Sequence, residues 1–270
     1  MNVLFFSFFL ICIGFFSCNT KAGNSAIASV DDSIQETISQ PAQVEKKIAK
    51  NLPAPKNCNL LLPTCYRLFE YDYSKCISNK WFELYEANGM YFLAPPVYSI
   101  EKSYDECAEV ASKCIRGSSD RNTIVFVNNP QFVSGLIKTS YPITKDIMPN
   151  NSAVFNNGLE SYSVAVFGDL KENVESEDNW ESYTNIKLRI TRIDSEGFHD
   201  QPLFTYDNLS NDSYFKVLFA GDLNKDNRPD FIIQVSTFYE EYTIYVYLSN
   251  DSQTAPFFDL YAQLLYQFDC

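Results

Sequence analysis

Residues 222 to 230 place oxygen-bearing side chains at alternate positions of one short segment. Acidic or amide side chains stand at loop positions 1, 3, 5 and 9, which are Asp222, Asn224, Asp226 and Asp230. Ca²⁺ takes about six to eight oxygen ligands, and alternate residues of a tight loop point toward one centre. The sequence therefore predicts a Ca²⁺ site formed by these four residues, with the backbone carbonyl of Arg228 as a further ligand.

An EF-hand and a plain polar turn are the alternatives to a stabilising Ca²⁺ site of this kind. An EF-hand requires an acidic residue at loop position 12, where this chain has Ile233, so the segment is not an EF-hand. A polar turn whose Asp and Asn side chains satisfy backbone groups is the structural alternative. The spacing favours Ca²⁺ over that turn, and a stabilising ion over a catalytic one. At loop position 6, where glycine is usual, Asn227 is the best substitute for a positive φ.

The elements that must position this loop are strands. From Cys58 onward, aromatic residues and alternation of apolar with polar residues are typical of half-buried strands. The dipeptide Asn88-Gly89 predicts a tight hairpin turn. The predicted strands are 81–86, 90–93, 97–101, 123–127, 162–167, 183–193, 214–219, 230–236 and 242–248.

Two segments carry helical signals. Ser103 with Glu106 forms a capping box, which predicts a helix over residues 104 to 115. Apolar residues between Phe257 and Phe268 recur with helical period, and a terminal edge strand is the rival there. We expect a mainly β fold of antiparallel sheets and hairpin units with one or two short helices, because parallel sheets need alternating helices.

A faint internal repeat links two parts of the chain. The segment Val164 to Leu170 is similar to Val217 to Leu223, and both contain Gly-Asp-Leu. Each is followed by a loop and a Tyr- and Thr-rich strand, from Tyr183 and Tyr242 respectively. The first loop lacks the acidic spacing of the second. The repeat predicts two related hairpin units, of which only the second binds metal.

The loop and its flanking strands resemble the calcium loop of FG-GAP repeats, the blades of integrin-α-type propellers. The resemblance covers about thirty residues around Ala220 to Leu248, and Asn227 stands where the family has glycine. One copy cannot form a full propeller, which needs at least about four blades. The wider layout, with Trp81 to Leu84, Tyr104 to Cys107 and a late Gly-Asp-Leu-Asn loop, looks like exported lipoproteins of the Bacteroidetes type. That resemblance implies no activity.

The N-terminus predicts export and lipid attachment. Residues 1 to 17 are uncharged, and their apolar run is shorter than the roughly 20 residues of a membrane span, so they match a secretory signal. Ser17-Cys18 resembles a bacterial lipobox, which implies cleavage before Cys18, acylation of Cys18 and a place in the cell envelope, at the outer membrane or cell surface. An ordinary cleaved signal or an uncleaved anchor is the alternative. Residues 18 to 57 lack aromatic side chains and predict a flexible tether.

The rest of the chain, residues 58 to 270, is predicted to be a β-rich globular domain with a possible division near residue 150. Six cysteines follow the tether, an even number that predicts disulfides in an exported chain without choosing among the connectivities. A bridge between Cys107 and Cys114 is disfavoured, because a helix would hold them about 10 Å apart. The disulfide candidates are Cys58, Cys65, Cys76, Cys107, Cys114 and Cys270.

Charge and motif content narrow the function. The net charge of −13 argues against a nucleic-acid partner, because such a surface repels phosphate. The single histidine, His199, stands in a polar stretch expected to be an exposed loop, and no nucleophile motif accompanies it. Acidic residues bunched at 172–181 could serve a surface glycan hydrolase or form a solvated loop. We therefore expect an envelope lipoprotein that binds a protein or glycan; an inhibitor or immunity-type protein is the third hypothesis.

Overall fold

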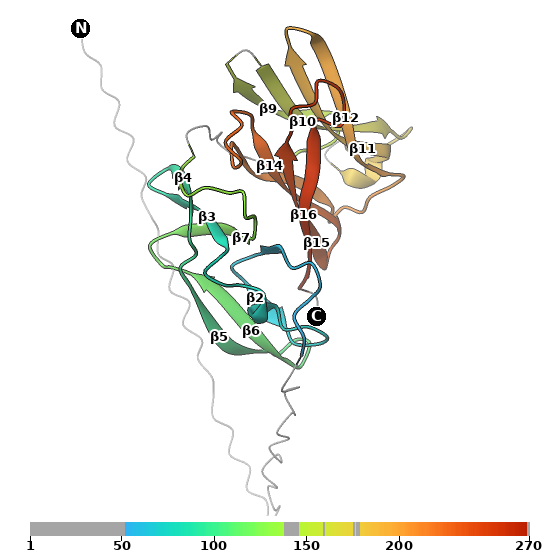
Figure 1. Cartoon of the computed structure of the whole chain (residues 1–270). Coiled ribbons are helices and arrows are strands. Elements are labelled where there is room, and N and C mark those ends of the chain that lie inside the picture. The colour runs from blue at the N-terminus through green and yellow to red at the C-terminus, as the bar shows by residue number, and fades with distance from the viewer. Residues whose placement is uncertain (1–51, 138–145, 159, 175, 177–178, 269–270) are drawn as a thin grey trace, which may run out of the picture. The chain divides into compact units, whose positions relative to one another are not determined.

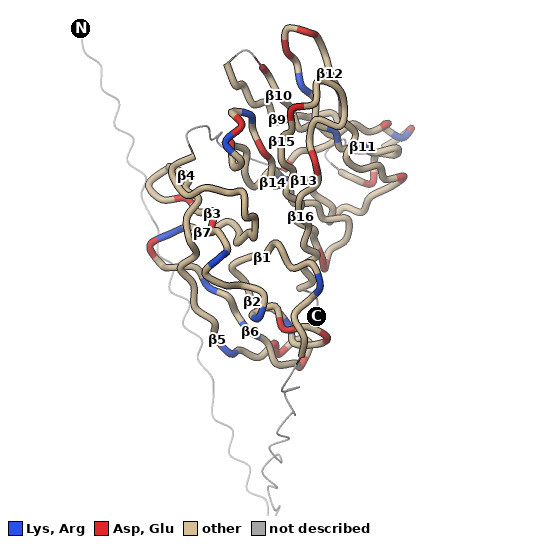
Figure 2. The backbone as a smooth tube through the Cα atoms, viewed as in Figure 1, with Lys and Arg blue, Asp and Glu red and all other residues tan. Residues whose placement is uncertain are grey.

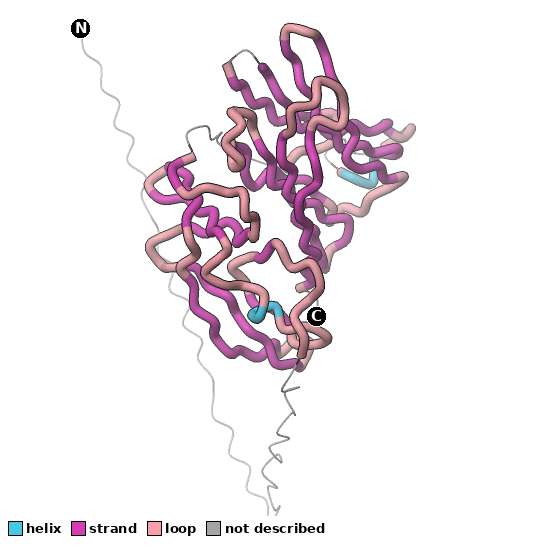
Figure 3. The backbone as a smooth tube through the Cα atoms, viewed as in Figure 1, coloured by secondary structure: helices cyan, strands magenta, loops and turns pink. Residues whose placement is uncertain are grey.

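The computed structural model describes residues 52–137, 146–158, 160–174, 176 and 179–268. Strands account for 57% of these residues and helices for 3%, and the strands form four antiparallel sheets (Figures 1 and 3). The mainly β prediction is confirmed, and the described part contains no propeller. Within the same residues no helix is long and apolar enough to cross a membrane. The leader, Cys18, residues 18–51 of the tether, and Cys270 lie outside the described residues.

Two sheets form from the first half of the chain. The five-stranded sheet has the order β1, β7, β3, β4, β8, and the three-stranded sheet has the order β2, β6, β5. Their bounds are β1 Leu60–Leu61, β2 Cys65–Arg67, β3 Phe82–Ala87, β4 Met90–Ala94, β5 Tyr98–Asp105, β6 Val110–Gly117, β7 Asn122–Val127 and β8 Gly135–Leu136. The short helix η1, Tyr73–Lys75, follows β2.

The second half forms two four-stranded meanders. One has the order β12, β11, β10, β9, and the other runs β13, β14, β15, β16. Their bounds are β9 Asn151–Asn157, β10 Glu160–Leu170, β11 Tyr183–Asp194, β12 Gly197–Tyr206, β13 Tyr214–Gly221, β14 Asp230–Phe238, β15 Glu241–Ser249 and β16 Phe258–Gln267. The short helix η2, Trp180–Ser182, precedes β11.

The sheet β13–β16 contributes to both hydrophobic cores. In β14, Ile232 belongs to the core shared with the N-terminal strands, whereas Phe231 and Ile233 belong to the core shared with β9–β12. Successive strand residues point to opposite faces, so both faces of this sheet are covered. This explains why Phe231, Ile232 and Ile233 are apolar in succession, with each of these three side chains no more than 1% exposed.

The predicted hairpin at Asn88-Gly89 is confirmed. Strands β3 and β4 pair up to Ala87 and Met90, and the two turn residues have φ of 54° and 76°. Positive φ at both central positions is the requirement that makes Asn-Gly favourable in two-residue hairpins.

The predicted helix over 104–115 is wrong, because this segment is the hairpin β5–β6. The Asp105 carboxylate caps the turn, accepting hydrogen bonds from the backbone N–H groups of Cys107 and Ala108. Ser112 and Cys114 are buried with the two-residue period of a strand. The hairpin pairing of β6 with β5 and its long-range pairing with β2 override the local capping signal.

The C-terminal segment is the strand β16, so the helical alternative is wrong there and the edge strand is correct. Ala262 and Leu264 are buried, whereas Leu265 is half exposed. The strand pairs with β15 along its length, from Phe258 with Ser249 to Gln267 with Glu241.

The two copies of the internal repeat both lie in hairpins, β10–β11 and β13–β14. They occupy different positions, because β10 is an inner strand of its sheet and β13 is an edge strand. The prediction for the second copy needs one correction: the strand after its loop is β14, which begins at Asp230, and Tyr242 belongs to the following strand.

Disulfides brace the N-terminal sheets. Cys58 is bonded to Cys76, and Cys65 on β2 is bonded to its register partner Cys114 on β6. Cys107 is also disulfide-bonded. The Cys107–Cys114 bridge is therefore absent, as expected, although the helical argument used against it was wrong.

Candidate metal centre

The loop 222–229 connects β13 to β14, and the bulged pairing of these strands ends at Gly221 opposite Asp230. Asp222 is thus the first residue after one strand and Asp230 the first residue of the next. The structure brings all five predicted ligands together in this loop. Each of their side chains has its own set of hydrogen-bond partners.

Asp230 is fully buried, and its carboxylate accepts four hydrogen bonds. Oδ2 accepts from the backbone N–H groups of Leu223 (2.6 Å) and Asn224 (3.1 Å). Oδ1 accepts from the backbone N–H and the hydroxyl of Ser249, at 2.8 and 3.0 Å. Burial raises the pKa of this carboxyl to about 7, and these backbone donors oppose the rise. Asp230 fastens the loop to the end of β15.

The loop turns through three side-chain caps. Asn224 Oδ1 accepts from the N–H of Asp226 (3.1 Å), and Asp226 Oδ1 accepts from the N–H of Arg228 (2.8 Å). Asp222 Oδ2 accepts from the N–H of Asn227 (3.1 Å). The φ of Asn227 is 68°, as predicted for loop position 6, and Lys225 also has a positive φ of 64°.

The second carboxylate oxygen of Asp222, Oδ1, is buried and has no hydrogen-bond partner among the described residues. Burial raises the pKa of Asp222, and the nearby charge of Asp226 raises it further, while hydrogen bonds from Asn227 and its neighbours lower it. A buried carboxylate oxygen without a donor is costly unless a cation or a proton accompanies it. A bound cation would therefore stabilise the loop most by contacting this oxygen.

The donor set of the loop fits Ca²⁺ in part. No group of three or more His, Cys, Asp or Glu side chains within the described ranges has a metal-holding arrangement. Ca²⁺ also accepts amide and backbone carbonyl oxygens and water, so such a group is not required. Asp222 Oδ1, the oxygens of Asn224 and Asp226, and the carbonyl of Arg228 are the atoms that would hold it. The Asp230 carboxylate is occupied by its four donors.

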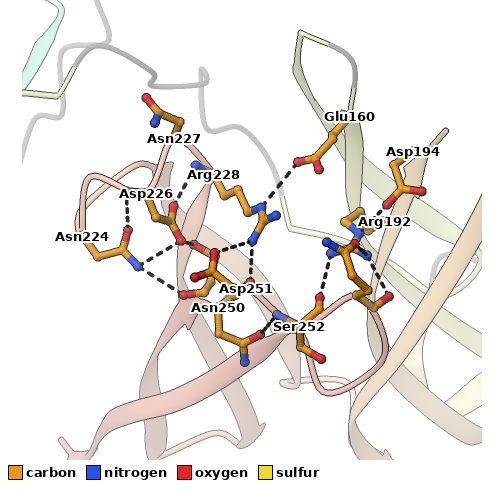
Figure 4. Close-up of polar contacts among 12 residues, drawn as sticks. Glu160, Arg192, Asp194, Asn224, Asp226, Asn227, Arg228, Asn250, Asp251 and Ser252 are labelled. Carbon is orange, nitrogen blue, oxygen red and sulfur yellow. Dashed lines mark hydrogen bonds and ion pairs between the residues drawn. The ribbon is translucent and has the colours of Figure 1, made fainter. Parts of the chain in front are cut away.

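Arg228 ties the loop to its neighbours with its side chain (Figure 4). Its guanidinium donates to the carbonyl of Asn250 (2.7 Å) and to the carboxylate of Asp251 (3.2 Å). Its Nε lies 3.8 Å from a carboxylate oxygen of Glu160, at the start of β10. The sequence predicts a role only for the backbone carbonyl of Arg228. It does not predict these contacts of the guanidinium.

A second arginine holds the same β15–β16 connection from the other side (Figure 4). Arg192 on β11 is 1% exposed and donates to the carbonyls of Ser252 (3.1 Å) and Gln253 (2.9 Å). Its Nε is 2.9 Å from Asp194. The connection is therefore fixed between the loop and the sheet β9–β12. No sequence signal could reveal this, because the acceptors are backbone carbonyls about sixty residues away.

The chain matches no family model, no curated protein and no solved structure in the comparisons made. The candidate centre therefore rests on its own geometry. No relative transfers a role to any of its residues.

His199 lies on β12, and its predicted place in an exposed loop is wrong. It pairs with Arg192 in register, and its Nε2 lies 3.2 Å from Asp194 Oδ1. The side chain is partly buried, with 18% exposure, and forms part of the Arg192–Asp194 network. Of the predicted acidic loop, Glu172 and Glu181 are described and 175, 177 and 178 are not.

Proposed function

We propose that the chain is an exported, lipid-anchored protein of the bacterial envelope that acts by binding, with a β-domain stabilised by Ca²⁺. The observation that carries the Ca²⁺ part is the buried Oδ1 of Asp222, at the first position of the loop, which accepts no hydrogen bond from any residue that the structure describes. Asx-type caps from Asp222, Asn224 and Asp226 hold the loop in one tight turn, which would lower the entropy that a bound ion must remove. Because Asp230 connects the loop to β15, ion binding would stabilise the sheet that serves both cores.

Disulfides support the export part. Cytosolic thiols are kept reduced, so disulfides of this kind are typical of exported proteins. Cys58–Cys76 and Cys65–Cys114 lie in the described domain. Together with the Ser17-Cys18 pair, they favour an envelope protein that contacts the membrane through an acylated cysteine.

The charge distribution supports a partner other than nucleic acid. Lys and Arg are distributed among Asp and Glu along the chain (Figure 2), and the sum is −13. Such a surface offers no strong attraction to phosphate backbones. A protein or a glycan is the partner class that we propose.

Calcium-dependent melting tests the proposal. An ion with a Kd of about 10 µM, present at about 1 mM, would stabilise the folded state by about 2.7 kcal/mol. For a domain of this size, that corresponds to a Tm increase of roughly 5 to 10 °C over chelator. Mg²⁺ should do less, because its smaller, rigid coordination suits this loop less well.

Asp222→Asn is the decisive variant, because it removes the charge of the unpartnered oxygen and keeps the size of the side chain. Its Tm should respond to Ca²⁺ by less than about 2 °C. In chelator it should melt no lower than the wild type, because a buried amide costs less than a buried carboxylate. Asp169→Asn is the matched control, since Asp169 follows Gly168 in the first repeat copy. Equal Ca²⁺ responses of wild type and Asp222→Asn would show that the loop is only a turn.

A further inference from the structure

A cleft of about 610 Å³ opens where the segment after β2 faces the end of β16. Its aromatic lining comes from Tyr66, Phe69, Tyr71, Tyr73 and Tyr266. Pockets of about 300 to 1,000 Å³ are the usual size for small-molecule ligands, and aromatic lining with a few polar groups is their usual composition. This cleft is separate from the loop 222–229 and shares no residue with it.

The floor of the cleft is rigid. Tyr66 and Tyr73 stack with ring centroids 4.7 Å apart, and Tyr266 meets Tyr66 edge-on at 5.9 Å. The Tyr266 hydroxyl lies 3.0 Å from the Thr64 hydroxyl and donates to the carbonyl of Cys65. These rings present flat faces whose orientation is already fixed.

The rim is exposed and also braced. Phe69 is 59% exposed and Tyr71 is 38% exposed, so both rings are accessible to a ligand. They lie between Cys65 and Cys76, and both of these cysteines are in disulfides. Holding the rim in one conformation lowers the entropy that a ligand must remove on binding.

Asp72 completes the bracing of the rim. Its carboxylate accepts a hydrogen bond from Lys113 (2.5 Å) on β6. Its backbone N–H donates to the carbonyl of Pro53. The aromatic rim is thus tied to the sheet beneath it and to the chain that enters the domain.

The polar groups of the cleft suit hydroxyls better than anions. Glu70 contributes a carboxylate that can accept from neutral hydroxyl groups. Gln267 contributes an amide whose Nε2 donates to Glu241 (3.1 Å), which leaves its second N–H and its oxygen for a ligand. The lining cation, Arg67, has its charge matched by Asp105, with Nε 2.7 Å from Oδ2. With a net charge of −13 on the chain, an anionic ligand would gain little here.

We propose that this cleft binds a neutral oligosaccharide, whose sugar rings lie against Phe69 and Tyr71 while Glu70 and Gln267 hydrogen-bond its hydroxyls. A sugar ring has an apolar C–H face and a rim of hydroxyls, which matches an aromatic wall bordered by acceptor and donor groups. The inference rests on the proposed binding function and names the ligand class. It does not depend on Ca²⁺ binding by the loop.

Isothermal titration calorimetry of the full chain in detergent tests the inference. The probes are neutral glucan, mannan and xylan oligosaccharides, with an oligogalacturonate as the anionic comparison, all at up to about 1 mM. At least one neutral oligosaccharide should bind and the anionic one should not. Phe69→Ala and Tyr71→Ala should each weaken binding by about two- to tenfold, the range expected for losing one aromatic contact. Phe198→Ala is the matched control, because Phe198 is 67% exposed on β12 and does not line the cleft.

The inference is overturned if no neutral probe binds, if binding survives both rim substitutions unchanged, or if Phe198→Ala loses as much binding as they do. Binding of the oligogalacturonate in place of the neutral sugars would also overturn it. The Ca²⁺-dependent Tm of the same variants is recorded in parallel. An unchanged Ca²⁺ response with no sugar binding would refute the cleft assignment while leaving the metal assignment standing.

Discussion

The carboxylate of Asp230 and the residue Ser249 are joined by two hydrogen bonds, from the backbone N–H (2.8 Å) and from the hydroxyl (3.0 Å) of the serine. The first residue of β14 is thus fastened to the last residue of β15. The same hydroxyl lies 2.8 Å from Asp226 Oδ2. Ser249 therefore connects two acidic residues of the loop, although no loop motif includes it.

Ser249→Ala should destabilise the domain by about 1 to 3 kcal/mol, because it removes the single O–H that two carboxylates share, one of them fully buried. Urea denaturation in chelator measures this loss without an ion. Ser99→Ala, on the exposed part of β5, is the control and should change stability by less than about 0.5 kcal/mol. Equal unfolding midpoints for Ser249→Ala and the control would contradict the role given to Ser249.

Arg121→Met should cost about 3 kcal/mol or more, because it leaves the carboxylate of Glu83 buried without its counter-charge. Glu83 is 0% exposed, and Arg121 donates to it at 2.8 Å. The double variant Glu83→Gln with Arg121→Met should recover part of the loss, because the buried charge is then gone. Chemical denaturation of both variants decides between these outcomes, and no recovery in the double variant would rule out the unpaired charge as the cause.

Stability should fall in acid partly through Asp72. Burial raises the pKa of this carboxyl, but the hydrogen bonds from Lys113 and Ser74 outweigh burial and hold the pKa below its usual 3.8. A depressed folded-state pKa gives stability that is present above the unfolded pKa and is lost as pH falls through the folded value. Thermal melts at pH values from about 6 down to 2 should show wild type losing more stability than Lys113→Met below about pH 4. If the Tm of wild type and of Lys113→Met fell equally with pH, Asp72 would not contribute to the loss of stability in acid.

Cys18→Ser should abolish lipid attachment, because the serine hydroxyl cannot replace the thiol that is acylated. The variant should accumulate in the unprocessed or aqueous-phase form on detergent phase partitioning. Cys12→Ser, within the apolar leader, is the control and should partition like wild type. Detergent-phase recovery of Cys18→Ser would disprove the lipid anchor.

Strands with clear alternation could be predicted from the sequence, and so could the hairpin at Asn88-Gly89, because both are local signals. The segment with β5 and β6 carries a helical signal, since Ser103 and Glu106 match a capping box, and its pairing within the hairpin and with β2 decides against a helix. Strand β12 was missed because its central residues, such as His199 and Asp200, are polar yet tied to β11.

The spacing of the acidic residues predicts the loop 222–229. It does not predict the hydrogen-bond partners of the loop's side chains. Ser249 and Asn250 reach the loop from the next hairpin, with no motif of their own. The aromatic rim could not be predicted either, because no sequence pattern shows that Phe69 and Tyr71 are exposed while Tyr66 is buried.

The position of β13–β16 between two cores has a consequence for the order in which the chain can fold. The N-terminal strands share their core with residues such as Phe219 and Ile244, which are synthesised long after them. Contacts so distant in sequence form slowly, because the intervening chain must first be brought together. The first half of the protein therefore cannot complete its interior until nearly all of the polypeptide is made. Such late closure would keep the chain unfolded until its synthesis is nearly finished, which is the state that the proposed export requires.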